Sequence, residues 1–236
     1  MFQEINLYSN LSKFKDISAL QKILLVFLSL IYVGMSKDIN MILLNCFIFV
    51  LINYIYKNPL KVILKIVLIS LTFSVFSSLG LFINKISISE IILINLRSLS
   101  GALSIGFLAL TTPITSIAKI LSRFDILRDI SDLLILTERF LIIIEEDYRK
   151  IFISIKSRYG FRDFKSSIKD LGKCLGSLFK NMFNRLKEIK VSSQNRCYRG
   201  RFYYRCENKL SKSMFLFIFI YVILFILKIL WLLFIL

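Results

Sequence analysis

Residues 133–158 read LLILTERFLIIIEEDYRKIFISIKSR, and this segment decides how the chain is organised. It is apolar enough to be mistaken for a membrane span, but three consecutive acids at 145–147 interrupt it. Each charge at the centre of a bilayer costs about 2.5–3.5 kcal/mol, so we do not expect the segment to cross the membrane. We predict a long amphipathic helix instead, with Gly160 as a C-terminal stop in the left-handed conformation. The acids are expected to form a solvated face or to pair with Arg149 and Lys150.

A second amphipathic helix is predicted over Ile168–Ile189. Its apolar residues recur at i, i+3, i+4 and i+7, while the other face is basic. The apolar residues are Ile168, Leu171, Leu175, Leu178, Phe179, Met182, Phe183, Leu186 and Ile189. Ser192 and Ser193 then predict the N-cap of a short third helix that ends near Gly200.

Outside this polar region, the apolar residues of the 236-residue chain come in five runs. Together with 56% hydrophobic residues and a mean hydropathy of +0.71, such runs are typical of an integral membrane protein. We predict an all-α integral membrane protein with about five transmembrane helices plus a cytoplasmic set of amphipathic helices. The first two runs are short, and a re-entrant pair is the alternative for them. The runs are Leu20–Met35, Ile39–Tyr56, Leu60–Ile83, Ile91–Leu110 and Met214–Leu236.

Positive charge is concentrated in one stretch. The net charge is +17, and 22 of the 32 Lys and Arg residues lie within 119–212. The positive-inside rule puts this stretch, the N-terminal arm and the 57–65 turn in the cytoplasm, and the C-terminus outside. Because the surplus flanks the apolar runs, it indicates a membrane face and argues against nucleic acid as a partner. The predicted domains are a four-span membrane bundle over 1–118, cytoplasmic helices over 119–212 and a final transmembrane helix over 213–236.

Five charged residues fall inside the predicted runs, and two of them, Lys61 and Lys65, lie in the first turns of the third run. Lys22 and Lys228 lie near run ends, where a lysine side chain can snorkel to water. Arg97 would be costly facing lipid, so we expect it near an interface or against protein. No His or Asp lies well inside the runs, which argues against an intramembrane enzyme.

Cysteine and histidine usage argues against a metal site in this chain. There are four Cys and no His, and no two Cys have the Cys-x-x-Cys spacing of a zinc site. We expect no catalytic residue and no cofactor in the chain itself. Residues 1–14 also lack the basic, apolar and small-residue order of a cleaved signal peptide.

Two basic clusters lie near the ends of the polar stretch, KSRYGF at 156–161 and RCYRGRF at 196–202. Each falls at a predicted helix end, where Gly lets the chain turn and Arg presents a rigid fork to carboxylates of a partner. The same arginines, Arg158 and Arg199, can instead neutralise helix C-termini or bind lipid phosphate. Charge alone leaves both interpretations open.

Four short motifs follow one another in a specific order. They are Leu110-Thr111-Thr112-Pro113 before a helix to Leu121, Leu136-Thr137-Glu138-Arg139-Phe140 leading into Ile144-Glu145-Glu146, Ser157-Arg158-Tyr159-Gly160-Phe161, and Tyr198-Arg199-Gly200-Arg201-Phe202. Together they resemble the transmembrane T component of energy-coupling factor transporters, closest to the cobalt-type, CbiQ-like branch. The resemblance covers almost the whole chain. The family's arginine motifs are usually Ala-Arg-Gly, whereas here Tyr159 separates Arg158 from Gly160 and Tyr198 replaces Ala. The docking residue that the resemblance implies for the first motif is therefore Arg158 or Arg162.

The resemblance implies a non-catalytic coupling subunit in the plasma membrane of a prokaryote. Two ATPase subunits of the ABC type, which bind the ATP, are expected to dock on the cytoplasmic helices. The implied docking residues are Arg158, Gly160, Arg162, Arg199, Gly200 and Arg201. The two long amphipathic helices are expected to relay the ATPase motion to a substrate-binding membrane S component. Cobalt is the implied substrate, with nickel or a vitamin as alternatives, and in the metal branch a separate subunit is expected to ligate the metal. The competing interpretation is a membrane-anchored, lipid-binding scaffold.

Overall fold

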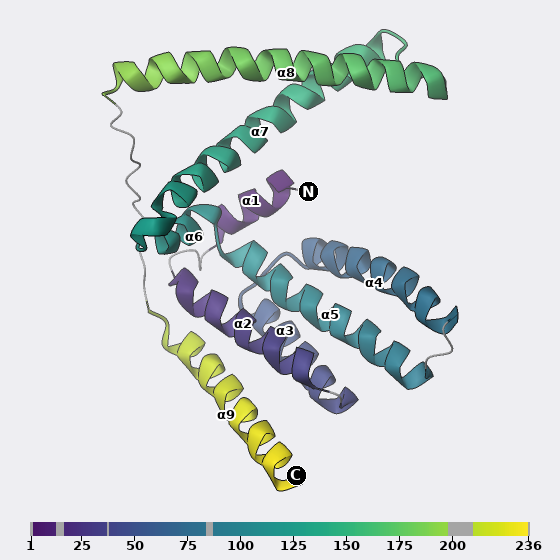
Figure 1. Cartoon of the computed structure of the whole chain (residues 1–236), viewed down its shortest axis with the longest axis vertical. Coiled ribbons are helices and arrows are strands. Elements are labelled where there is room, and N and C mark those ends of the chain that lie inside the picture. The colour runs from purple at the N-terminus through teal and green to yellow at the C-terminus, as the bar shows by residue number, and fades with distance from the viewer. Residues whose placement is uncertain (1, 13–16, 37, 84–86, 198–209, 236) are drawn as a thin grey trace. The chain divides into compact units, whose positions relative to one another are not determined.

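The structure is a computed structural model that describes residues 2–12, 17–36, 38–83, 87–197 and 210–235 (Figure 1). These residues form nine α-helices and one short 3-10 helix. In chain order they are α1 Phe2–Leu11, α2 Ala19–Met35, α3 Ile39–Ile55, α4 Leu60–Ile83, α5 Ile88–Thr111, α6 Ile114–Leu121, η1 Asp125–Leu127, α7 Arg128–Ser157, α8 Phe164–Asn195 and α9 Lys212–Ile235. The chain divides into two compact units, Met1–Ile120 with Cys206–Leu236, and Leu121–Arg205.

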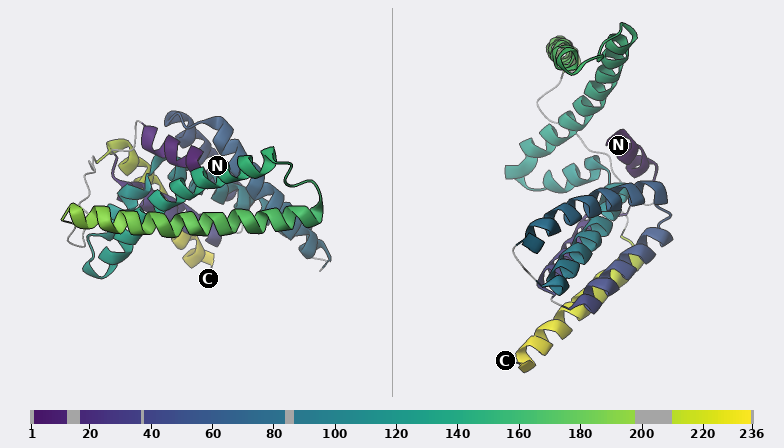
Figure 2. Two further views of the ribbon diagram at one scale, coloured as in Figure 1. Left: turned by 90° about the horizontal axis from the view of Figure 1, so that it is seen from above. Right: turned by 90° about the vertical axis from the view of Figure 1, so that its right-hand side faces the viewer.

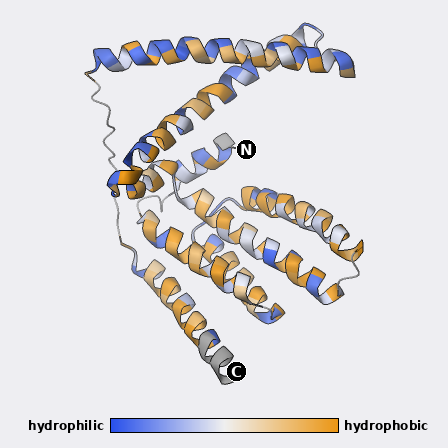
Figure 3. Cartoon of the chain, viewed as in Figure 1, coloured by the Kyte–Doolittle hydropathy of each residue, from blue (hydrophilic) through white to orange (hydrophobic). Residues whose placement is uncertain are grey.

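The first unit contains the helices that hydropathy predicts as spans. α4 and α5 have 24 residues each and are long and apolar enough to cross a membrane. α2 and α3 are apolar helices of 17 residues, and α9 adds another 24. Figure 3 shows these helices mainly in the hydrophobic colour, whereas α8 alternates between hydrophilic and hydrophobic residues. The prediction of an all-α integral membrane protein is confirmed.

The short helices α2 and α3 come close to the length of a span. A helix of 17 residues rises about 26 Å, slightly less than the ~30 Å hydrocarbon core of a bilayer. To cross the core, each helix would need local thinning of the bilayer or flanking side chains that reach the interface.

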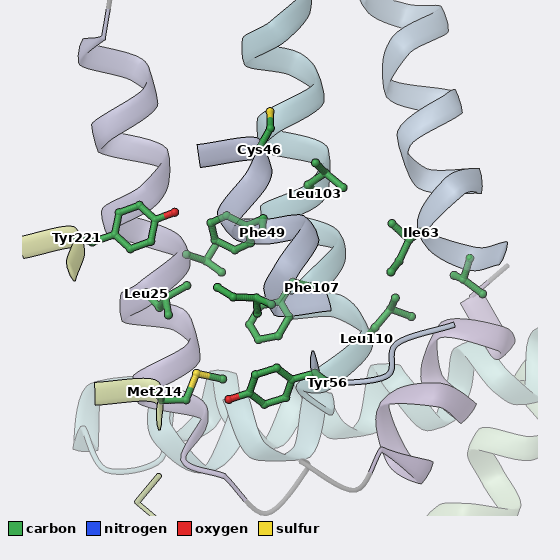
Figure 4. Packing of buried hydrophobic residues seen from close by; sticks show 13 residues of the cluster. Leu25, Cys46, Phe49, Tyr56, Ile63, Leu103, Phe107, Leu110, Met214 and Tyr221 are labelled. Carbon is green, nitrogen blue, oxygen red and sulfur yellow. The ribbon is translucent and has the colours of Figure 1, made fainter. Parts of the chain in front are cut away.

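The core of the bundle is aromatic where α3, α5 and α9 meet (Figure 4). The rings of Phe49 on α3 and Phe107 on α5 are edge to face, with centroids 6.2 Å apart, and Tyr56 packs on Phe107 at 5.5 Å. Tyr221 of α9 packs on Phe49 at 6.2 Å. Lipid chains are as apolar as these side chains, so close packing rather than hydrophobic burial holds the helices together.

Buried hydrogen bonds join the same three helices. Asn45 Nδ2 of α3 donates to Ser100 Oγ of α5 at 2.6 Å, and the hydroxyl of Tyr221 on α9 donates to Asn45 Oδ1. Within α5, Ser104 Oγ donates back to the carbonyl of Ser100 at 2.9 Å. All four side chains are fully buried. Because no water is available in the membrane interior, these pairings hold α9 in one register against α3 and α5.

Cationic side chains satisfy the carbonyl ends of two neighbouring helices. Lys22, at the start of α2, donates to the Thr111 carbonyl at the end of α5 at 2.7 Å, and Arg97 of α5 donates to the Ser36 carbonyl after α2 at 2.6 Å. The prediction that Lys22 snorkels is wrong, because the end of α5 offers its ammonium an acceptor inside the bundle, where the side chain is fully buried. Arg97 faces protein, as predicted. Lys228 donates to Ser36 Oγ at 2.8 Å, beside the same helix end.

We expect Lys22→Met to destabilise the bundle, because the variant keeps the length of the side chain but removes the donor for the buried Thr111 carbonyl. An unpaired buried acceptor costs about 1–3 kcal/mol. Thermal unfolding of the purified protein in detergent measures the loss. The matched control is Lys61→Met on the exposed surface of α4, which should change stability by less than about 0.5 kcal/mol. Equal stabilities of the two variants would contradict the role of Lys22.

Candidate functional site

The two long helices of the second unit, α7 and α8, contain the predicted amphipathic segments. Figure 2 shows α8 nearly end-on in its right-hand view, with α7 beside it, and the two helices are in contact. α8 continues without a break from Phe164 to Asn195. The predicted third helix with an N-cap at Ser192 and Ser193 is therefore wrong in its start, since both serines lie in the last turns of α8 and Ser193 Oγ donates back to the Lys190 carbonyl at 3.0 Å. No Gly or Pro lies between residues 189 and 195 to end the helix earlier.

The first arginine cluster forms the corner between α7 and α8. α7 ends at Ser157, and the amide of Gly160 donates to the Ile155 carbonyl at 3.0 Å. Tyr159 and Phe161 adopt the left-handed conformation, with φ of 60° and 62°. The prediction that Gly160 takes this conformation is wrong, because its two neighbours take it instead.

Gly160 has a different role in the corner, which is to permit a close approach. A Cβ at this position would lie 2.7 Å from the Ile155 carbonyl oxygen and 3.2 Å from Asp170 Oδ2. Real Cβ atoms essentially never approach a backbone atom so closely. The turn therefore needs a residue without a side chain, but for space rather than for backbone freedom.

Asp170 of α8 is the hydrogen-bonding centre of the corner. Its Oδ2 accepts the backbone N–H of Phe161 at 3.1 Å and the hydroxyl of Ser166 at 3.2 Å, and its Oδ1 accepts Lys173 Nζ at 3.1 Å. The Phe161 N–H, and after it the Lys173 ammonium, hold the pKa of Asp170 below its ordinary value. Sequence reasoning missed this residue, although an acid within a strongly basic helix was a signal that could have pointed to it.

A row of aromatic rings fixes the corner to α7 on its other side. Phe161 packs on Phe152 with ring centroids 4.9 Å apart, and Phe152 packs on Tyr148 at 5.7 Å. Phe161 is thus held twice, by its backbone N–H on Asp170 and by its ring on α7. Such double attachment makes the corner rigid.

A bidentate ion pair joins α7 to α8 away from the corner. Arg185 Nε and Nη2 donate to Asp147 Oδ2 and Oδ1 at 3.2 and 3.1 Å. The expectation that Asp147 is solvated or pairs with Arg149 or Lys150 is wrong, because the carboxylate is largely buried against α8. Arg149 pairs with Glu145 at 2.8 Å, as expected from their spacing of four residues.

The corner presents both candidate arginines of the first motif to the surroundings. Arg158 directly follows the last residue of α7 and Arg162 lies beyond the turn, and both are exposed. Within the part of the chain that the structure describes, neither guanidinium has a hydrogen bond or an ion-pair partner. Two unpaired guanidinium groups on a rigid turn can form bidentate hydrogen bonds with carboxylates of another protein. Arg199, Gly200 and Arg201 of the second motif lie outside the described residues.

Comparison with known proteins gives a family and two relatives. The family model CbiQ, described as a cobalt transport protein, matches residues 12–204. The uncharacterized protein MJ1089 of Methanocaldococcus jannaschii is 30% identical over 105 residues, which are 44% of this chain and 39% of that protein. A protein of Methanocorpusculum labreanum, named as a fused cobalt transport protein, CbiMQ, is 30% identical over 104 residues, 44% of this chain and 17% of that protein. The match thus spans less than two fifths of the length of either relative.

Gly160→Ala should open the corner, because the added methyl group collides with the Ile155 carbonyl oxygen. Overpacking of this kind costs about 1–3 kcal/mol. The measurement is hydrogen exchange of the 158–170 segment, which should become faster. Gly172→Ala and Gly176→Ala are matched controls in the open surface of α8, and helix propensity predicts that they are neutral or slightly stabilising. Unchanged exchange in Gly160→Ala would contradict the proposed close contact.

Asp170→Asn should weaken the corner in a pH-dependent way. Because the folded-state pKa is lowered, the carboxylate contributes stability above its ordinary pKa, and this contribution is lost as the pH falls through the lowered value. At neutral pH, hydrogen exchange of the 158–170 segment should therefore be faster in the variant than in wild type. At acidic pH the two exchange rates should become equal. Asp163→Asn is the control, since this exposed carboxylate makes no side-chain cap bond. A gap that is constant with pH would refute the role of the Asp170 charge.

Proposed function

Because the chain belongs to the CbiQ family of cobalt transport proteins, we propose that it is the membrane coupling subunit of an ATP-driven cobalt importer of the energy-coupling-factor type. In this role the chain hydrolyses nothing. Two ATPase subunits of the ABC type bind its second unit, and a separate membrane subunit binds the metal ion. Nickel and vitamin substrates are the alternatives within this type of transporter.

The observation that carries the proposal is the exposed guanidinium of Arg158 on a rigid corner. A coupling contact has to carry force without yielding, so its anchor must be fixed to the helices that move. Arg158 meets this requirement because it directly follows α7, while Asp170 and Phe152 hold the turn behind it. A lipid-binding arginine has no need of such a support, since lipid headgroups adapt to the side chain.

The second unit has the properties of a lever. α7 has 30 residues and α8 has 32, which correspond to lengths of roughly 45 and 48 Å. The Asp147–Arg185 pair and the corner join the two helices at separate places along their lengths. A motion imposed at the corner is then passed along both helices rather than absorbed by bending of the loop.

The topology of the proposed subunit follows from its charge distribution. We place the N-terminus and residues 119–212 in the cytoplasm and the C-terminus outside. The functional domains of the proposal are the membrane bundle 1–118, the coupling helices 119–212 and the final membrane helix 213–236. Arg199, with Gly200 and Arg201, provides the second anchor, so that each of the two ATPases receives one arginine motif.

The absence of histidine from the sequence agrees with metal binding in a different subunit. Cobalt and nickel ions prefer imidazole, thiolate and carboxylate ligands arranged together. The family description and the name of the M. labreanum relative favour cobalt.

The docking role is tested with Arg158→Ala in the complex of the chain with its ATPases. Loss of a buried, hydrogen-bonded charge partner costs about 2 kcal/mol or more, which is a roughly 30-fold weaker association. ATPase co-purification and cobalt uptake should both fall, while the protein stays in the membrane. The variant Arg162→Ala measures how much the neighbouring arginine contributes to binding of the ATPases. Arg149→Ala is the matched control, because this exposed arginine of α7 already pairs with Glu145.

Normal ATPase binding by Arg158→Ala and by the double variant Arg158→Ala/Arg162→Ala would refute docking through the corner. A preparation that retains anionic lipid but never an ATPase would support the lipid-binding scaffold instead.

A further inference from the structure

A cavity of about 380 Å³ lies in the first unit, between α1 and the turn that joins α3 to α4. One part of its wall is polar and the other is apolar. The polar residues include Tyr8, Ser12 and Lys57, and the apolar residues include Leu11, Ile55 and Leu110. The cavity is not part of the docking corner, and the proposed coupling function does not use it.

Lys57 occupies a backbone position that normally belongs to glycine. It has a φ of 50°, its N–H donates to the Tyr54 carbonyl at 3.0 Å, and the Asn58 N–H donates to the Asn53 carbonyl at 3.2 Å. This is the Schellman ending of a helix, whose left-handed residue is usually Gly. A lysine here carries a backbone strain that glycine would relieve, and strained residues of this kind concentrate at ligand-binding sites.

The ammonium of Lys57 is available to a ligand. The side chain is exposed, and among the described residues it has no hydrogen-bond or ion-pair partner. Lys65, by contrast, reaches Glu4 at 3.5 Å. Asn58, next to Lys57, is fixed by a hydrogen bond from its Nδ2 to Asn53 Oδ1 at 2.8 Å, which holds the turn in place. The strained lysine therefore points to an anion rather than to an internal contact.

Exposed apolar side chains beside the cavity indicate that this anion has a hydrocarbon tail. Leu11 and Ile55 line the cavity and are 76% and 55% exposed. Lys57 follows the end of the apolar helix α3, at the level where tyrosine and lysine side chains meet lipid headgroups. A free phosphate ion would leave the apolar wall uncovered, whereas a lipid covers it.

We propose that this cavity is a binding site for an anionic glycerophospholipid, with the phosphate on the ammonium of Lys57 and an acyl chain along Leu11 and Ile55. Basic pockets between membrane helices bind lipid headgroups in this way. The site selects its ligand by the charge of Lys57 at the headgroup and by the apolar residues that line the same cavity.

The test is a titration of the purified full-length chain in detergent with phosphatidylglycerol, with bound lipid counted by native mass spectrometry. Lys57→Gly removes the ammonium but suits the left-handed turn, so the variant should unfold at the same temperature as wild type or higher. Its affinity for phosphatidylglycerol should fall about fivefold, as expected for one interfacial lysine. Lys57→Arg should bind like wild type.

Lys61→Gln is the matched control, because Lys61 is exposed at the start of α4, four residues further along the chain, and does not line the cavity. It should bind phosphatidylglycerol like wild type. Wild-type affinity in Lys57→Gly would overturn the proposal, and so would an equal loss in Lys61→Gln, which would show diffuse attraction to the surface. Displacement of the lipid by millimolar inorganic phosphate would also overturn it, since the ligand would then be the free anion.

Discussion

The bond from Lys22 to the carbonyl of Thr111 is the contact on which the membrane bundle depends. α5 packs against α1, α2, α3 and α4, so it is the central helix of the first unit. It ends at Thr111 because Pro113 follows and has no N–H to continue the ladder. The carbonyls freed there lie among buried side chains, where no water can satisfy them. A lysine at the start of α2 supplies the donor, and Arg97 does the same for the end of α2.

Polar contacts of this kind determine how the helices pair, because lipid gives no hydrophobic preference for one helix over another. α9 illustrates this best. The chain reaches it only after the whole second unit, and its surface is almost entirely apolar. Three hydrogen bonds fix its position against the bundle. The Tyr221 hydroxyl donates to Asn45 Oδ1, and Lys228 Nζ donates to Ser36 Oγ. Just before the helix begins, the backbone N–H of Ser211 donates to Gln21 Oε1 at 3.2 Å. These bonds attach α9 to α2 and α3 at its start, near its middle and in its second half.

Hydropathy predicts the apolar helices to within three residues at each end, because the bilayer imposes a simple rule on composition and length. The same reasoning fails where a side chain meets a distant partner. Asp147 and Arg185 are 38 positions apart, so only the fold reveals their pairing. Asp170 at the corner is missed for the same reason. Lys22 was expected to snorkel because a sequence shows a lysine near a run end but not the helix end beside it.

The backbone conformation explains how the first arginine motif accommodates Tyr159 between Arg158 and Gly160. In the usual Ala-Arg-Gly pattern, glycine follows arginine directly and is free to turn. Here Tyr159 takes the left-handed conformation, and Gly160 is displaced into the crowded space between Ile155 and Asp170. The extra residue is thus absorbed inside the turn and does not lengthen α7. Arg158 keeps its place at the helix end, whereas Arg162 lies beyond the second left-handed residue. If the corner docks a partner as we propose, this geometry favours Arg158 over Arg162 as the anchor, because Arg158 directly follows α7.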